Sequence, residues 1–239
     1  MTHPIFRDAP YQKEARGRVI AQTPEGGIVL DQSLFYATSG GQPGDTGRLS
    51  WQSGGCGVAT AVKGEGDSIV LVPDAGPLPD IGTEVAQELD WEQRHSHMRV
   101  HTALHLLSVV IPLPVTGGSI SRGKGRLDFD MPDALDNKDA LQDQLNALIE
   151  KDLAVIESWI SEAELDANPG LVKTMSVQPP RGAGRIRLIR IGEGADQVDL
   201  QPCGGTHVAR TAEIGRVRLG KTEKKGKQNR RVYLHLEDT

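Results

Sequence analysis

Two short motifs carry side chains that can ligate a metal ion. Residues 101–105 read HTALH and residues 203–207 read CGGTH, so each motif places two ligands four positions apart. Residues at i and i+4 of a helix lie on one face, with Cβ atoms about 5–6 Å apart, so one histidine pair can bind a single ion. Either pair alone is also compatible with coincidence. Together, three imidazoles and one thiolate are typical zinc ligands, and they predict one shared Zn2+ site: His101, His105, Cys203 and His207.

A third stretch, ATSGGQPGDTG at residues 37–47, is rich in glycine and polar side chains. Glycine permits tight turns, and it also lets backbone amides approach a ligand closely. The stretch lacks the lysine followed by serine or threonine that ends a P-loop, and it lacks the glycine spacing of a dinucleotide-binding fingerprint. It is therefore either a wide turn between strands, which composition slightly favours, or a ligand loop, for which Thr38 and Gln42 are the reason.

The elements that must position these motifs differ along the chain. Residues 1–90 contain six short β-compatible runs separated by Gly- and Pro-rich turns, a pattern that indicates a small barrel. A domain boundary is expected near Asp90. A mostly apolar helix is predicted over residues 91–111, where prolines follow, and it would carry the first ligand pair. His95 and His97 are expected to face solvent.

The second part of the chain mixes helical and strand patterns. We predict an amphipathic helix over residues 137–151, with a leucine-rich face. The other expected elements are a turn at 117–119, strands at 126–130, 153–160, 185–191 and 198–200, and a hairpin of 215–219 with 231–236. The expected fold class is α+β: a small N-terminal β-barrel-like domain, residues 1–90, and an α/β domain with the zinc site, residues 91–239.

Composition limits the classes of function. Of 239 residues, 37% are hydrophobic and only 4% aromatic, and the net charge is −5. Neither a general nucleic-acid coat nor a base-stacking surface is indicated. Basic residues nevertheless concentrate in segments 181–190 and 216–231, which form either a local basic face or ordinary solvated strands. Two cysteines give no disulfide framework, and no N-terminal apolar run indicates a signal or a membrane span. A cytoplasmic protein is expected.

The motifs, in their order along the chain, resemble a known family. The FYATSGGQPGDTG run, HTALH, the RLDFD strand, CGGTH and the KKGKQNRR tail are similar to the editing domain of alanyl-tRNA synthetases. They resemble still more closely the free-standing alanyl-tRNA editing proteins, the AlaX group, of medium size. The resemblance covers nearly the whole chain, and it implies a zinc-dependent hydrolase that removes a wrong amino acid from mischarged tRNA(Ala). Serine is the chief expected substrate and glycine the second.

The resemblance also implies roles for individual residues. Thr38 and Gln42 are the expected catalytic-site residues, facing the metal from the N-terminal domain, and Thr38 would recognise the serine hydroxyl. The other expected substrate contacts are Gly40, Gly41, Arg181, Lys225 and Arg230. The expected partner is mischarged tRNA(Ala), without a membrane, and a monomer is slightly favoured. Leu104 stands where synthetase-embedded members often have threonine, and residues 116–119 stand where they tend to carry a glutamine.

Three alternatives stay open from the sequence. Four protein ligands form a closed tetrahedron, whereas hydrolytic zinc usually keeps an open position. Either one ligand binds weakly, with His207 the preferred candidate, or the metal only positions the substrate.

The chain could also be a non-catalytic zinc module that binds tRNA, or an editing deacylase for another aminoacyl-tRNA, such as the threonyl type.

Overall fold

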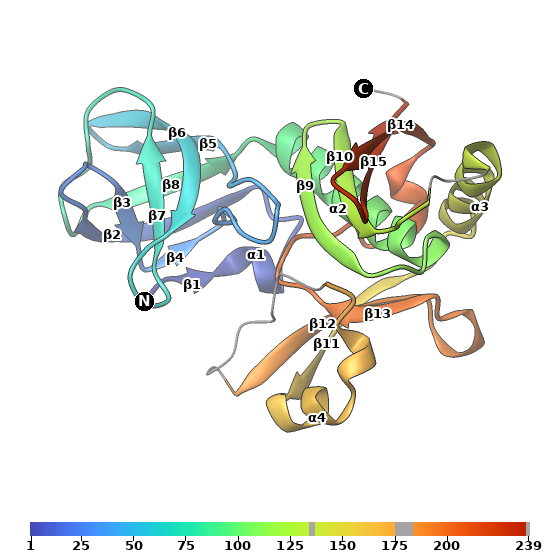
Figure 1. Cartoon of the computed structure of the whole chain (residues 1–239). Helices are drawn as coiled ribbons and strands as arrows, with labels where there is room; N and C mark the ends of the chain where they lie inside the picture. The colour runs from blue at the N-terminus through green and yellow to red at the C-terminus, as the bar shows by residue number, and fades with distance from the viewer. Residues whose placement is uncertain (134–136, 175–183, 238–239) are drawn as a thin grey trace. The chain divides into compact units, whose positions relative to one another are not determined.

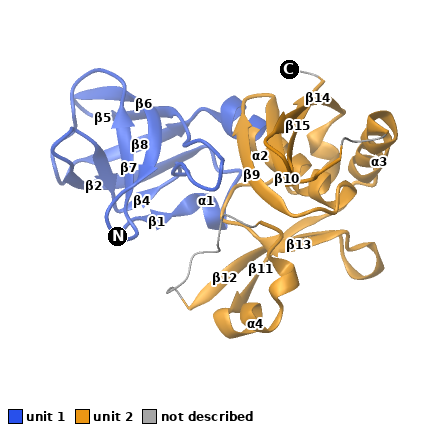
Figure 2. Ribbon diagram, viewed as in Figure 1, with its two compact units in different colours: residues 1–96 blue, residues 97–239 orange. Residues whose placement is uncertain are grey.

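The computed structural model describes residues 1–133, 137–174 and 184–237 (Figure 1). The chain divides into two compact units, Met1–Ser96 and His97–Thr239 (Figure 2). Helix α2 (Trp91–Val110) runs through the division between the units. The predicted domain limits, 1–90 and 91–239, stay predictions.

The first unit is built around a closed barrel of antiparallel strands in the order β2-β3-β7-β6-β5-β8. Buried and exposed residues alternate along β2 and β8, so one side chain in two points into the barrel core. A short parallel pair, β1 (His3–Pro4) with β4 (Gln32–Ser33), and helix α1 (Ile5–Asp8) complete the unit. The predicted small barrel is thus confirmed. Its strands are β2 (Glu14–Gln22), β3 (Ile28–Leu30), β5 (Gly47–Trp51), β6 (Gly54–Lys63), β7 (Ile69–Pro73) and β8 (Glu84–Leu89).

A buried ion pair fixes the segment that follows the glycine-rich turn. The side chains of Arg94 and Asp45 are 0% and 1% exposed, and Nε of Arg94 lies 3.0 Å from Oδ2 of Asp45. The guanidinium also donates to the carbonyls of Leu34 and Pro10, and Asp45 accepts from the Tyr36 amide. Burying a charge is costly unless it is paired and hydrogen-bonded. Asp45 therefore has a structural role, because it neutralises the buried guanidinium of Arg94.

In the second unit, helix α2 packs against a four-stranded antiparallel sheet with the order β14-β15-β10-β9. Gly125 in β10 lies at the contact: a Cβ atom there would be 2.7 Å from Val100 and 3.0 Å from Leu104 of α2. The helix therefore approaches this strand more closely than a side chain would allow. The strands are β9 (Val115–Ser121), β10 (Lys124–Asp130), β14 (Val217–Lys225) and β15 (Asn229–Leu236), so the predicted strand near 126–130 and the long hairpin are confirmed.

The predicted turn at residues 117–119 is wrong, because these residues lie within strand β9. Gly117 pairs with Asp128 and Gly118 with Leu127 of β10. A Cβ atom at Gly118 would lie 3.1 Å from the Leu127 side chain, so glycine here permits close packing within the sheet and does not reverse the chain.

Helix α3 (Lys138–Glu150) completes this part of the unit. It begins after Asn137, whose side chain accepts from the Ala140 amide, as helix N-caps do. The predicted amphipathic helix is confirmed, although a polar residue, Asn146, is buried with its apolar face. Its side-chain amide pairs with both backbone groups of Val217, at 3.0 Å each, and so satisfies polar groups at an edge of strand β14.

A separate three-stranded antiparallel sheet, β11-β12-β13, carries the second metal motif at its end. Its strands are β11 (Val155–Ser161), β12 (Arg185–Ile191) and β13 (Asp199–Pro202). One face packs with helix α4 (Glu162–Ala167) in a small core that contains Leu165, Ile186 and Leu188. The strands predicted near 153–160 and at 185–191 are confirmed, and the fold is α+β. Within the described parts of the chain, no helix has the length and apolar character needed to cross a membrane.

Candidate metal centre

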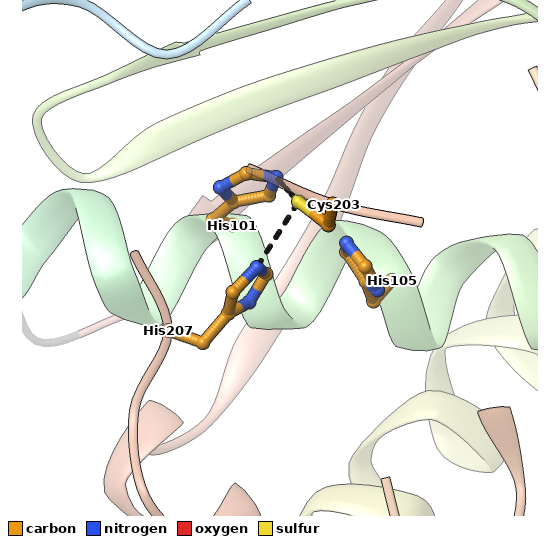
Figure 3. Close-up of side chains that lie close together, drawn as sticks. All are labelled: His101, His105, Cys203 and His207. Atoms are coloured by element: carbon orange, nitrogen blue, oxygen red, sulfur yellow. Dashed lines mark hydrogen bonds between the residues drawn. The ribbon is translucent and has the colours of Figure 1, made fainter. Parts of the chain in front are cut away.

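The four predicted ligands lie together in the second unit. Two come from helix α2 and two from the segment after strand β13, and their side chains point toward one another (Figure 3). One ligand atom from each lies within 4.8 Å of all the others. Sγ of Cys203 is 3.4 Å from Nε2 of His101 and 3.3 Å from Nε2 of His207. The three imidazoles are buried, and the thiol is half-buried. Three nitrogen donors and one sulfur converging on one point suit zinc.

Asp199 orients one of these imidazoles. Its Oδ2 lies 3.0 Å from Nδ1 of His105, and a carboxylate can only accept from the ring, so Nδ1 keeps its proton and Nε2 is the nitrogen that would bind a metal after releasing its own proton. Burial alone would lower the pKa of His105, but hydrogen bonds to Asp199 and Cys203 raise it to about 9. Asp199 in turn accepts from Gln201 at 2.7 Å and from Nζ of Lys173 at 2.5 Å. This carboxylate–histidine arrangement is the one that metal sites use.

Thr102 plays the corresponding part for His207. The Thr102 hydroxyl donates to the Met98 carbonyl at 2.9 Å, so toward Nδ1 of His207, 3.2 Å away, it acts as an acceptor. The ring proton then sits on Nδ1, and Nε2 faces Cys203. Burial, followed by the charge of His101, lowers the pKa of His207 to about 3. The ring is therefore held in the tautomer that a metal requires. The prediction that His207 is the weakest ligand stays a prediction.

Cys203 lies where a thiolate is favoured. Burial raises the pKa of its thiol, but the neighbouring His101 and His207 outweigh this and hold the pKa well below its usual range. The Gly205 amide points at the sulfur from 3.4 Å. A thiolate is the form that binds metals.

Arg187 holds the loop of residues 203–207 that carries this cysteine, called the metal loop below. Its Nη1 donates to the carbonyls of Cys203 and Gly205 at 3.0 and 2.9 Å, while its Nε donates to Glu157 at 2.7 Å. Arg187 belongs to the basic segment 181–190, for which the sequence indicated either a local basic face or ordinary solvated strands. The structure instead gives its guanidinium three contacts within the protein, two of them to the metal loop.

The glycine-rich run of the first unit is a tight turn. Ser39 and Gln42 bridge each other through their backbones, and the two glycines between them have φ values of +56° and +84°, as a type I′ turn requires. The Thr38 hydroxyl donates to the Ala61 carbonyl at 3.2 Å and accepts from the Gly44 amide at 2.8 Å. Thr38 is exposed and Gln42 is fully buried. Their expected roles, with those of Gly40 and Gly41, stay predictions.

Three of the expected substrate contacts, Arg181, Lys225 and Arg230, are basic residues. Arg181 lies outside the described residues. The guanidinium of Arg230 donates to the carbonyls of Pro132 and Asn229, and Nζ of Lys225 lies 3.6 Å from a carboxylate oxygen of Glu223. Both basic side chains thus have partners within the protein, and contact with RNA stays a prediction for all three.

The structure also corrects the expectation for the histidines that precede the HTALH motif. His97 is only 2% exposed, so the prediction that it faces solvent is wrong. His95 is half-buried and stacks on the ring of Trp91, with centroids 5.2 Å apart. The apolar pattern of the helix could not predict this burial, because it does not tell which polar side chains a neighbouring element covers.

Comparison with known proteins gives matches along nearly the whole chain. Residues 186–233 match the family described as threonyl and alanyl tRNA synthetase second additional domain, and residues 8–93 match the class II (A) tRNA synthetases. An alanine–tRNA ligase of Pyrobaculum arsenaticum is 32% identical over 93% of this chain, which spans about a quarter (25%) of that ligase.

Smaller relatives match from end to end. The alanyl-tRNA editing protein AlaX-M of Methanosarcina barkeri is 32% identical over 100% of both chains. That of Saccharolobus solfataricus is 34% identical over 99% of this chain and 100% of its own.

Proposed function

The chain belongs to the AlaX-M alanyl-tRNA editing proteins, and we propose that it hydrolyses the ester between tRNA(Ala) and a wrongly attached amino acid, chiefly serine and secondarily glycine. The observation that carries this proposal is the cluster of three imidazoles and one thiolate, whose ligand atoms lie within 4.8 Å of one another. The partner is mischarged tRNA(Ala), and no ATP is needed because ester hydrolysis is downhill.

The cluster suits this chemistry. Hydrolysis of an aminoacyl ester needs an activated water, a polarised carbonyl and stabilisation of the developing oxyanion. A Zn2+ ion held by His101, His105 and Cys203, with His207 as a weak fourth ligand that leaves a position open, would supply a Lewis acid for the carbonyl and lower the pKa of a water molecule. The protein's own contribution is orientation: Asp199 and Thr102 each accept the Nδ1 proton of a ligand histidine, so that Nε2 of each ring is the atom directed to the metal.

In this proposal, Thr38 discriminates between serine and alanine. Its hydroxyl proton is already used by the Ala61 carbonyl, so the oxygen can only accept a further hydrogen bond. The serine hydroxyl, or another donor of the substrate, would supply that bond, and alanine lacks the hydroxyl. Sites that pair with a substrate hydroxyl reject the analogue without it, because their own polar group is left unpaired. Gln42 is proposed as a second polar residue of the same site.

The test is single-turnover deacylation of tRNA(Ala) charged with serine, glycine or alanine. We expect rapid release of serine, slower release of glycine and retention of alanine, with activity lost on chelation and restored by Zn2+. Cys203→Ser is the matched loss-of-ligand variant, and the buried Cys56→Ser controls for loss of a thiol elsewhere. Binding of tRNA without release of any amino acid would contradict the proposal and favour a non-catalytic tRNA-binding module.

The same assay should include serine-charged threonine tRNA. The family model that matches residues 186–233 is shared by threonyl and alanyl synthetases, so this substrate is the specific competitor. Preference for the threonine tRNA would overturn the assignment to tRNA(Ala) and leave the hydrolytic chemistry intact.

A further inference from the structure

We infer that Trp159 and Arg185 form a stacking platform for a base at the single-stranded 3′ end of the tRNA. Trp159 is 38% exposed, whereas Trp51 and Trp91 are half-buried. The Arg185 guanidinium lies over the Trp159 ring, 5.4 Å from its centroid. An exposed aromatic ring beside a cation is the arrangement with which proteins hold unpaired bases, because every base has a π-face and a nearby phosphate. The inference rests on the proposed function for the identity of the RNA.

The platform lies on the same face of the sheet as the metal loop. Trp159 in β11 pairs with Arg187 in β12, and directly opposed residues of an antiparallel pair project from one face. Arg185 is two residues from Arg187 and projects from that face as well. On the other side of β12, the Cys203 amide donates to the Arg187 carbonyl at 3.2 Å.

This register fixes the approximate distance to the ligands. From Trp159 through Arg187 to Cys203 the path crosses two strand spacings of about 4.8 Å each, so the backbones are about 10 Å apart. The reacting ester is attached to the terminal ribose of the tRNA. A base of the terminal or preceding nucleotide can therefore lie on Trp159 while the ester lies at the metal loop.

The charges on this face favour an RNA strand there. Arg187 is neutralised by Glu157, at 2.7 Å. Within the described residues, no carboxylate forms an ion pair with Arg185, which is exposed. An unneutralised guanidinium next to an exposed ring attracts a phosphate to the place where a base can stack. The opposite face of the sheet is covered by α4 and its apolar core, so only one face is available.

A direct binding experiment tests the platform independently of catalysis. We would titrate the protein with an acceptor-stem hairpin that ends in single-stranded CCA and follow tryptophan fluorescence. We expect the hairpin to quench the wild-type signal, and we expect the quench to disappear in Trp159→Leu and with a hairpin whose three terminal nucleotides lack bases. Undiminished quenching in Trp159→Leu, or none in the wild type at saturating RNA, would overturn the inference.

Deacylation of mischarged tRNA supplies the second arm. Trp159→Leu should lower kcat/KM about tenfold, within the range for one lost stacking contact, while Trp159→Phe keeps most of it. Arg185→Gln should weaken RNA binding and reduce its salt dependence, and Arg185→Lys should restore much of both. Arg16→Gln, an exposed barrel residue, controls for net charge. If no variant of Trp159 or Arg185 differs from the wild type, the inferred stacking platform is wrong, whereas the proposed hydrolase activity is unaffected. If the wild type hydrolyses no substrate, the proposed activity is wrong, and the fluorescence titration alone tests the platform.

Discussion

Oδ2 of Asp199 lies 3.0 Å from Nδ1 of His105, and the two side chains are 0% and 7% exposed. Ninety-four positions separate them in the chain. The contact joins the strand before the CGGTH motif to the helix that carries HTALH, and so it links the two elements that carry the ligand pairs. Partners of this kind fix the orientation of a metal-binding imidazole, and their loss typically weakens metal affinity by about 10–100-fold.

Replacing Asp199 should therefore weaken metal binding without removing a ligand. We expect Asp199→Ala to lower the affinity for Zn2+ by about 10–100-fold. Asp199→Asn, which keeps an acceptor oxygen, should lower it less. Competition with a chromophoric chelator measures both. The control is Asp196→Ala in the exposed turn before β13; equal affinities for Asp199→Ala and this control would show that Asp199 does not orient the ligand.

The buried pair of Arg94 and Asp45 predicts a large effect on stability. Arg94→Met leaves the Asp45 carboxylate buried without its cation, so we expect the free energy of unfolding to fall by about 3–5 kcal/mol. Arg16 and Glu84 form an ion pair whose side chains are 79% and 53% exposed. Arg16→Met should then cost about 1 kcal/mol or less. Denaturant unfolding compares the two, and similar midpoints would mean that the buried pair stabilises little.

The barrel and the ligand helix could be predicted because local pattern determines them. Strand periodicity with Gly and Pro turns marks the first unit, and prolines end the helix directly after its apolar run. The four residues of the candidate metal centre could be chosen by residue type and spacing. Asp199 could not, because nothing near it in sequence distinguishes an aspartate that meets a histidine in space. The glycines at 117–118 misled for a related reason: glycine permits a turn and close packing equally.

Composition also hid the exposed tryptophan. The low aromatic content gave no indication of a stacking surface, but a percentage does not show which rings are exposed, as Trp159 is. Similarly, the basic segment 181–190 indicated either a local basic face or ordinary solvated strands. It could not show that Arg187 turns to the metal loop, while Arg185 forms no ion pair with any carboxylate of the described residues.

Substitution of Thr38 separates recognition from loop structure. The hydroxyl holds the turn through Ala61 and Gly44, so Thr38→Val should cost about 1 kcal/mol of stability even if the residue never meets substrate. If the hydroxyl also recognises serine, release of serine should fall more than release of glycine, by tenfold or about 1.4 kcal/mol. Thr38→Ser keeps the hydroxyl and should retain both. An equal loss for both substrates would leave Thr38 only its structural part.

Gly125 predicts a link between sheet packing and the metal site. A methyl group there would lie 2.7 Å from Val100 Cγ1 and 3.0 Å from Leu104 Cδ1, next to His101 and His105 in the chain. Gly125→Ala should displace α2, cost about 1–3 kcal/mol of stability and weaken Zn2+ binding. Gly170→Ala, where a Cβ meets nothing within 4 Å, is the control. Unchanged melting and metal affinity in Gly125→Ala would show that the helix adjusts freely.

Asp128 predicts a pH-dependent contribution to stability. Burial would raise the pKa of this carboxyl, but the hydrogen bonds from Arg231, at 2.7 and 2.8 Å, and from Arg126 hold it below its usual value. Because the folded-state pKa is depressed, the contribution is fully present above the unfolded pKa of about 3.9 and is lost as the pH falls through the folded value. We compare the free energy of unfolding of the wild type with that of Asp128→Asn. The difference should be constant from neutral pH to about pH 5, at about 1 kcal/mol or less, because the charges are partly exposed. Below about pH 4 the difference should shrink. Asp143→Asn, on the exposed side of α3, controls for removal of one charge, and a difference that persisted unchanged into acid would mean that Asp128 acts through packing and not through its charge.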